Sequence, residues 1–192
     1  MSILDIDTLV QDDKFFVEKW LKVNCEIFGS YTIKDGVVNV TGNVSLKRKI
    51  QSINIQFGVV TGNFSCVGCI DLTSLEGAPK EVGEEFNCSD CYSLTSLEGA
   101  PEVVGGNFVC YDCPNLTSLE GAPEVIGGSF FCSDCKSLTT LEGAPKVVSE
   151  DFYCNSCKSL TSLQGAPKEV GRSFFCSYCD SLTSLQGAPK RS

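Results

Sequence analysis

Apolar and polar positions repeat along most of this chain with a fixed period. From residue 62 to residue 192, a unit of twenty-two residues occurs six times in the same register, with Phe-x-Cys-x-x-Cys-x-x-Leu-Thr-x-Leu-x-Gly-Ala-Pro as the shared pattern. A period of this length is typical of a solenoid, in which one unit cannot bury its own apolar face and depends on the unit stacked against it. The sequence therefore predicts an elongated stack of coils whose residues form columns.

The first forty residues follow other patterns. Apolar residues recur at helical spacing up to Val23, and Asp12 or Asp13 is well placed as an N-cap, so we predict a helix over about 13–24. Residues 31–40 alternate between apolar and polar on both sides of an Asp-Gly pair, which predicts a β-hairpin. Helix and hairpin together are interpreted as a cap on the N-terminal end of the stack.

These patterns divide the chain into three parts. Residues 41–46 resemble residues 61–66, although the earlier segment has no cysteine. We therefore assign residues 1–41 to the cap, 42–61 to a degenerate first coil and 62–192 to the six repeats.

The repeat also resembles a known family. The segment from Gly106 to Leu116 resembles the cysteine form of the leucine-rich repeat, with Phe108, Cys110 and Cys113 among its inward positions. The continuing Leu-Thr-Ser-Leu-Glu-Gly-Ala-Pro is similar to short leucine-rich repeat proteins of bacteriophages. This resemblance covers residues 62–192 and implies a solenoid with one short parallel β-strand per coil and little helix outside the cap. The chain departs from many of those proteins in carrying Cys where they carry Asn.

Within each coil, the Phe-x-Cys segment is expected to be the only regular strand. Side chains alternate along a strand, so Phe108 and Cys110 should face the core while Asn107, Val109 and Tyr111 face a concave outer surface. The Leu-Thr-x-Leu segment should bring a further pair of leucines into the core, and Gly-Ala-Pro should reverse the chain.

The paired cysteines raise the question of metal binding. Two cysteines three residues apart on an extended strand would lie about 10 Å apart, too far to share one zinc ion. We therefore interpret one cysteine column as core filling and the other as weak S–H donors to the turn backbone, and we predict no metal or cofactor. Disulfides between stacked coils and a metal site remain the alternatives. The expected location is the reducing cytoplasm, because thirteen cysteines occur without a recognisable signal peptide.

Charge and composition narrow the function classes further. The chain has no histidine, which excludes Ser-His and Cys-His catalysis, so we predict that it is not an enzyme. The net charge is -9, and the repeats hold seventeen acidic against eight basic side chains. This balance argues against a nucleic-acid partner and favours a basic protein partner, and no apolar stretch predicts a membrane partner.

One position of the repeat is occupied by different residue types in different units. The residue between Phe and Cys is polar in the first units and large and apolar in the last ones. Because packing does not dictate this position, we predict that it carries binding. The candidate partner-binding residues, with the neighbouring turn positions, are Val109, Tyr111, Asp112, Phe131, Asp134, Tyr153, Phe175 and Tyr178. The alternative is that the aromatic side chains only stabilise the stacked strands.

These observations lead to a functional hypothesis. The expected function is a non-enzymatic protein–protein interaction through an acidic, aromatic concave face, and the resemblance to phage proteins implies inhibition of a host protein, such as a defence factor, in the host cytoplasm. One alternative is self-assembly, with a homodimer formed through the aromatic patch or the last coil. Another is mimicry of nucleic acid by the acidic columns.

Overall fold

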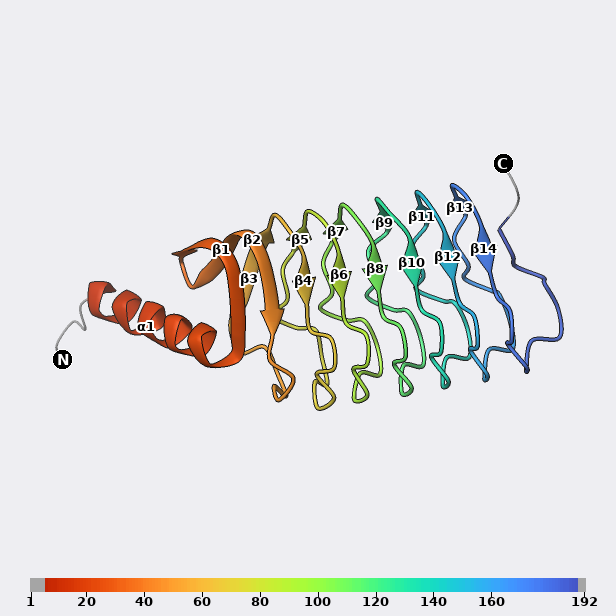
Figure 1. Cartoon of the computed structure of the whole chain (residues 1–192), viewed down its shortest axis with the longest axis horizontal. Helices are drawn as coiled ribbons and strands as arrows, with labels where there is room; N and C mark the ends of the chain where they lie inside the picture. Colours follow the sequence, from red (N-terminus) through yellow and green to blue (C-terminus); the bar gives the residue numbers. More distant parts are fainter. Residues whose placement is uncertain (1–5, 190–192) are drawn as a thin grey trace.

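The chain folds into a repeat solenoid with one helix at its N-terminal end (Figure 1). The computed structural model describes the backbone of residues 6–189 and the side chains of residues 13–189. This architecture confirms the predicted fold class of a stack of coils with short strands. In the described part of the chain, no helix combines the length and apolarity needed to cross a membrane.

The cap helix is longer than the sequence pattern suggested. α1 spans Ile6–Asn24, so the prediction that Asp12 or Asp13 caps its N-terminus is wrong. Asp13 lies inside the helix with its side chain exposed. At such a position aspartate costs the helix about 0.7 kcal/mol relative to alanine, which is a small penalty. Trp20 packs edge-on against Phe57 of the first coil, with ring centroids 6.4 Å apart, and so joins the helix to the core of the stack.

The predicted hairpin is confirmed. β1 (Cys25–Lys34) pairs antiparallel with β2 (Val37–Leu46). Asp35 and Gly36 connect the two strands with φ angles of 52° and 75°. Two successive residues with positive φ are what a type I′ turn requires, which explains the Asp-Gly pair.

The coils carry two parallel ladders of short strands, where one was expected. The first ladder continues from β3 (Gln56–Val60) through β5 (Glu81–Val82), β7 (Val103–Val104), β9 (Val125–Ile126), β11 (Val147–Val148) and β13 (Glu169–Val170). The second consists of β4 (Phe64–Ser65), β6 (Phe86–Asn87), β8 (Phe108–Val109), β10 (Phe130–Phe131), β12 (Phe152–Tyr153) and β14 (Phe174–Phe175). The prediction of a single strand per coil is therefore wrong.

β2 belongs to both ladders. Its first half pairs with β3 from Val37 to Val40, and its second half pairs with β4 through Val44 and Ser45. Val44 lies opposite Phe64, in the register that the similarity of residues 41–46 and 61–66 suggested. The hairpin and the first coil thus share one strand.

The core consists of columns that run along the stack. The phenylalanines that open the second-ladder strands are fully buried from β4 to β12, and their rings stack at centroid distances such as 5.1 Å between Phe108 and Phe130. Both leucines of each Leu-Thr-x-Leu segment are also fully buried in the first five repeats, as predicted. In the last described coil, Phe174 is only partly buried.

Candidate protein-binding surface

Three predicted site residues form a continuous aromatic ladder on the outside of the second strand ladder. Phe131, Tyr153 and Phe175 are the second residues of β10, β12 and β14, and they pair in register. The ring centroids are 4.7 Å apart in both pairs, with interplanar angles of 4° and 8°. The spacing follows that of neighbouring strands, about 4.8 Å, so the backbone holds the rings in parallel.

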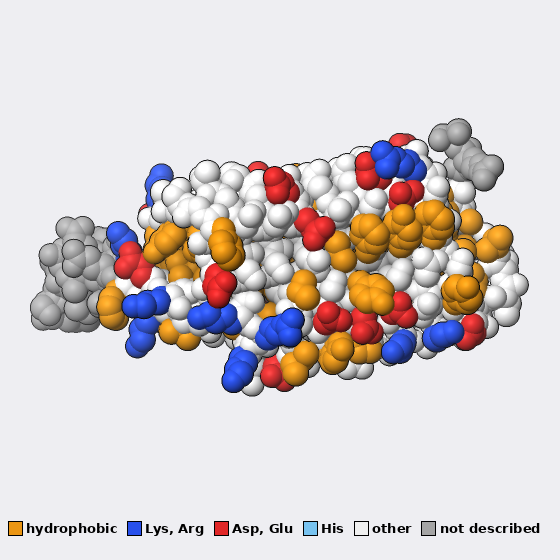
Figure 2. Space-filling model, viewed as in Figure 1, with side chains coloured by type: hydrophobic (Ala, Val, Ile, Leu, Met, Phe, Trp, Pro, Cys, Tyr) orange, Lys and Arg blue, Asp and Glu red, His pale blue; other side chains and the backbone are white. Residues whose placement is uncertain are grey.

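This stacking determines which parts of the rings a partner can reach. The rings cover one another's faces, so Phe131 and Tyr153 are half-buried, while Phe175 is 38% exposed. Tyr153, which has a ring on both sides, therefore offers its edge rather than its faces to solvent, and the exposed apolar area of the ladder is smaller than three free aromatic side chains would give. Figure 2 shows a row of hydrophobic side chains across the half of the stack nearer the C-terminus.

Charged side chains border the aromatic ladder. The Tyr153 hydroxyl donates a hydrogen bond to Asp151, 3.4 Å away, and Arg172 forms an ion pair with Glu150 at 3.1 Å. Partial desolvation and the negative charge of Asp151 raise the pKa of Tyr153, so its hydroxyl stays protonated at neutral pH. The border thus offers both acceptor oxygens and a cation.

Apart from Val109, the other predicted site residues lie in the turns between the two cysteines of each repeat. Asp112, Asp134 and Tyr178 occupy the same turn position with φ angles of 48°, 60° and 60°, so none of them belongs to a strand. The negative charge of Asp134 raises the pKa of Tyr111, which lies in the neighbouring coil. Tyr111 was expected on the strand face, but β8 ends at Val109 and places it in the turn.

Val109 connects the aromatic ladder to the more N-terminal coils. It lies opposite Phe131 in the parallel register and is half-buried. The same column holds Ser65 and Asn87 in the earlier coils, where the side chains accept hydrogen bonds from backbone amides two residues later. The strand pairing is therefore the same whether the column carries a polar or an aromatic side chain.

The cysteines line the core rather than a site. The first cysteine of each pair is fully buried from Cys66 to Cys154, and the Sγ atom of the second cysteine donates to its carbonyl in the preceding coil, as from Cys135 to Cys110 at 3.2 Å. The predicted role of the second column as weak S–H donors to the backbone is confirmed. Burial raises the pKa of Cys69 to about 12 and that of Cys88 well above its usual range, so these thiols stay neutral.

The geometry assumed for the cysteine pairs is nevertheless wrong. Cys66 and Cys69 do not lie on an extended strand, because a turn joins them in which the amide of Cys69 donates to the carbonyl of Cys66 at 3.2 Å. The residue before the second cysteine takes a positive φ, from Gly68 at 71° onward. Even so, no group of three or more His, Cys, Asp or Glu side chains in the described part of the chain is arranged to hold a metal ion.

A polar ladder beside the phenylalanines was missed by the sequence analysis. Asn107 was expected to face the concave surface, but its Oδ1 atom accepts a hydrogen bond from the amide of Ser129 in the next coil, at 2.9 Å. The Ser129 hydroxyl accepts in turn from the amide of Asp151, at 3.2 Å. The signal was a polar residue before Phe in every repeat, which satisfies backbone donors that the two-residue strands leave free.

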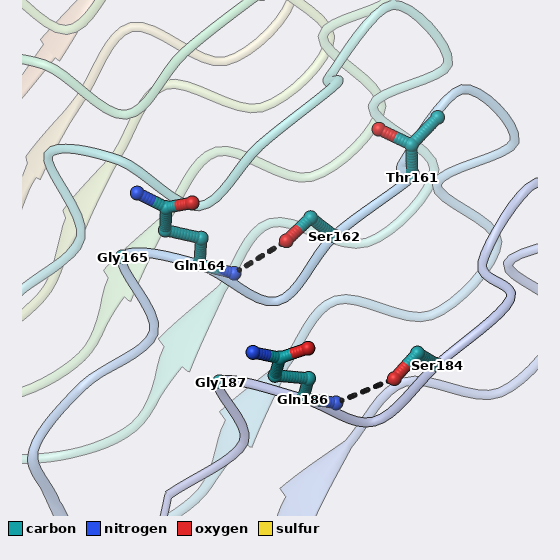
Figure 3. Close-up of a pocket in the computed structure, with 7 residues that line it drawn as sticks. All are labelled: Thr161, Ser162, Gln164, Gly165, Ser184, Gln186 and Gly187. Atoms are coloured by element: carbon teal, nitrogen blue, oxygen red, sulfur yellow. Dashed lines mark hydrogen bonds between the residues drawn. The ribbon is translucent and has the colours of Figure 1, made fainter.

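A polar depression lies between the last two turns (Figure 3). It has a volume of about 470 Å³ and is lined by Thr161, Ser162, Gln164, Gly165, Ser184, Gln186 and Gly187. The backbone N–H groups of Gln164 and Gln186 donate to serine hydroxyls of their own turns, each at 3.0 Å. No charged or apolar side chain is among the lining residues, so we do not include this depression in the candidate binding surface.

In the view of Figure 1 the stack runs nearly straight, so we name the surface by the aromatic ladder rather than by a concavity.

Comparisons with protein-family models, with curated proteins and with solved structures found no match. The resemblance to phage leucine-rich repeat proteins therefore stays an inference from the repeat itself.

Proposed function

We propose that this protein is a non-enzymatic binding module whose aromatic ladder of Phe131, Tyr153 and Phe175 contacts another protein. The observation that supports this most strongly is the change of character within one column. Ser65 and Asn87 occupy it with the strand pairing intact, so the coils do not need aromatic side chains there in order to stack. Stacked rings do add stability, about 0.5–1.5 kcal/mol per pair, but apolar edges exposed to water are a cost that a partner would remove.

The chemistry of the surface favours a partner with apolar and basic side chains. Ring edges and the Tyr153 hydroxyl are bordered by Asp151 and Glu150, and aromatic residues with a charged rim are typical of protein interfaces. A sugar that stacks on aromatic faces is a poorer fit, because neighbouring rings occupy both faces of Tyr153 and one face each of Phe131 and Phe175.

The alternative of nucleic-acid mimicry is less well supported. Basic side chains neutralise part of the acidic surface through ion pairs between Lys146 and Glu124, between Lys158 and Asp180, and between Arg172 and Glu150. A mimic of the phosphate backbone would need an uninterrupted row of negative charge.

The resemblance to phage proteins favours a host protein as the partner, and inhibition of that host protein as the role of the complex.

The test compares capture by two sets of variants. The triple variant Phe131→Ser, Tyr153→Ser, Phe175→Ser should lose a partner captured by the native protein from host extract. The control variant Tyr92→Ser, Tyr31→Ser removes two other exposed aromatic side chains and should retain the partner. A photo-crosslinking residue at position 153 should label the same partner, whereas one at position 87 should not.

Both variants must be folded for the comparison to count. Trp20 is the only tryptophan and is 8% exposed, so its fluorescence reports an intact cap, and the circular dichroism of the stack reports the coils. Equal capture by the folded triple variant and the native protein would remove the aromatic ladder from the proposal.

A further inference from the structure

The turns at the cysteine pairs change in charge along the stack. In the second, third and fourth repeats, the residue before the second cysteine is Asp90, Asp112 or Asp134. The first repeat has Gly68 at this place, and the coil before it has three consecutive basic residues at 47–49. In Figure 2 most of the Lys and Arg side chains on the visible face lie in the part nearer the N-terminus.

The basic turn belongs to the same column of turns as the cysteine pairs. Its amide of Ile50 donates to the carbonyl of Lys47 at 3.3 Å, as the amide of Cys69 donates to the carbonyl of Cys66 at 3.2 Å. The Sγ atom of Cys69 also donates to the Lys47 carbonyl, at 3.6 Å, in the way that later turns are joined. The turn of residues 47–50 therefore stacks directly on that of residues 66–69.

Gly68 leaves room for the side chain of Arg48. A Cβ atom at position 68 would lie 3.1 Å from Nε and 3.3 Å from Cδ of Arg48, so this side chain lies against the turn. Its positive charge opposes, in part, the rise that burial causes in the pKa of Cys69. The packing against Gly68 thus positions the guanidinium group at the surface of the turn column.

Arg48 and Lys49 have no acidic partner within the chain that the structure describes. None of the ion pairs among the described residues includes either side chain. Both line a pocket of about 680 Å³, and Ile70 and Tyr92 line it with them, 48% and 44% exposed. We call these four residues the basic pocket. A guanidinium group binds a carboxylate through two parallel hydrogen bonds, and the apolar side chains offer a contact surface beside it.

We propose that the basic pocket binds an acidic segment of another protein, which places a carboxylate on Arg48 and an apolar side chain against Ile70 and Tyr92. Asp71 and Asp90 also line the pocket, and the chain has a net charge of -9. An unbroken run of phosphates would meet repulsion there, whereas a short acidic segment with apolar residues would not. The aromatic ladder lies in the last three repeats, so this inference does not depend on the proposed function.

The first test uses a fluorescently labelled hexapeptide in which apolar residues alternate with pairs of acidic residues, and it measures anisotropy. The native full-length protein should bind the peptide with a Kd of about 10–100 µM at low salt, and added salt should weaken binding. A control peptide that carries the corresponding amides in place of the acids should bind at least about tenfold more weakly, because Arg48 then has no carboxylate to bind.

The second test compares two variants at position 68. Gly68→Asp introduces the residue that three other repeats carry there at φ angles of 48° to 60°, so the turn accepts it. Its carboxylate would pair with Arg48, and the Kd for the peptide should rise about tenfold or more. Gly68→Asn has nearly the same shape without the charge and should stay within about threefold of the native Kd. Arg48→Ala removes the cation without changing residue 68 and should match Gly68→Asp.

Each remaining outcome supports or overturns the proposal. It is overturned if the native protein does not bind the peptide at about 1 mM, or if Gly68→Asp and Arg48→Ala both bind it as the native protein does. Tighter binding of a labelled single-stranded oligonucleotide than of the peptide would assign the pocket to nucleic acid and reject the acidic segment. The Phe131, Tyr153, Phe175 triple serine variant should bind the peptide as the native protein does, so failure of the aromatic ladder would leave this result unchanged.

Discussion

The Gly-Ala-Pro turn should be a point at which the stack tolerates little added volume. Gly121 has a φ of 93°, and a Cβ atom at this position would lie 2.4 Å from the amide nitrogen of Glu98 and from the carbonyl carbon of Leu97. Both atoms belong to the backbone of the preceding coil and cannot rotate away. We predict that Gly121→Ala forces the two coils apart and destabilises the protein severely.

The expected magnitude has two parts. Alanine at positive φ costs about 1–2 kcal/mol. Moving the coils apart also strains the bonds that join them, including the hydrogen bond from the Leu97 amide to the Glu120 carbonyl, at 2.8 Å. Leaving a buried backbone group unpaired costs about 1–3 kcal/mol, so the total loss should be about 2–5 kcal/mol.

Two other glycines separate these contributions. Gly36 has a φ of 75°, but a methyl group added there would have no other atom within 4 Å, so Gly36→Ala should cost only the conformational part, about 1–2 kcal/mol. Gly187 has the same φ of 93° as Gly121, but the nearest atom to its Cβ position is 2.8 Å away, so Gly187→Ala should fall between the two.

The assay is urea unfolding of each variant, followed by circular dichroism for the coils and by Trp20 fluorescence for the cap. Because each coil contacts only its neighbours, disagreement between the two probes would show that the stack no longer unfolds as one unit. If Gly121→Ala and Gly36→Ala lose the same free energy of unfolding within about 0.5 kcal/mol, the close approach of the turns is not a determinant of stability and the reasoning is refuted.

Two further predictions concern the core. Phe130 is fully buried and stacks between Phe108 and Phe152, so Phe130→Ala should lower the free energy of unfolding by about 3–5 kcal/mol, measured in urea; a loss below about 1 kcal/mol would contradict the packed column. Burial raises the pKa of Cys25 from 9.0 to about 11 and that of Cys69 from 9.0 to about 12. The unfolded chain therefore loses these protons at a lower pH than the folded protein does, so stability should fall as the pH rises from about 9 towards 12. Thermal unfolding across this pH range tests the prediction, and a constant midpoint would contradict it.

The column arrangement could be predicted because the repeat places the same type of residue at the same position in successive units. In the first five repeats, Phe64 and its equivalents, with the leucines of the Leu-Thr-x-Leu segments, occupy the core that the pattern assigned to them. One apolar residue in one coil would be ambiguous, but the same residue at the same position in successive coils indicates a column along the stack. The aromatic ladder follows from the same logic, since residues that share a repeat position share a position along the stack.

Features that depend on backbone conformation within the unit could not be predicted in this way. The Cys-x-x-Cys segment was interpreted as extended, although a turn joins Cys66 and Cys69. Asp90 and Asp112 take the left-handed conformation there, which aspartate tolerates better than most residues, but this tolerance alone does not indicate a turn. The first ladder was missed because strands such as Val103–Val104 are too short to show alternation.

The sequence by itself determined the period, the buried columns, the hairpin and the absence of histidine chemistry, because each depends on which residues recur and at what spacing. Only the tertiary structure decided how far each side chain is exposed. Tyr153 has a stacked ring on both sides and offers its edge, whereas Phe15 and Phe16 belong to the same helical pattern as Trp20 and yet lie open to solvent. The exposure of a side chain depends on which residues of neighbouring coils pack against it. Those packing partners are determined by the folded stack rather than by the local sequence.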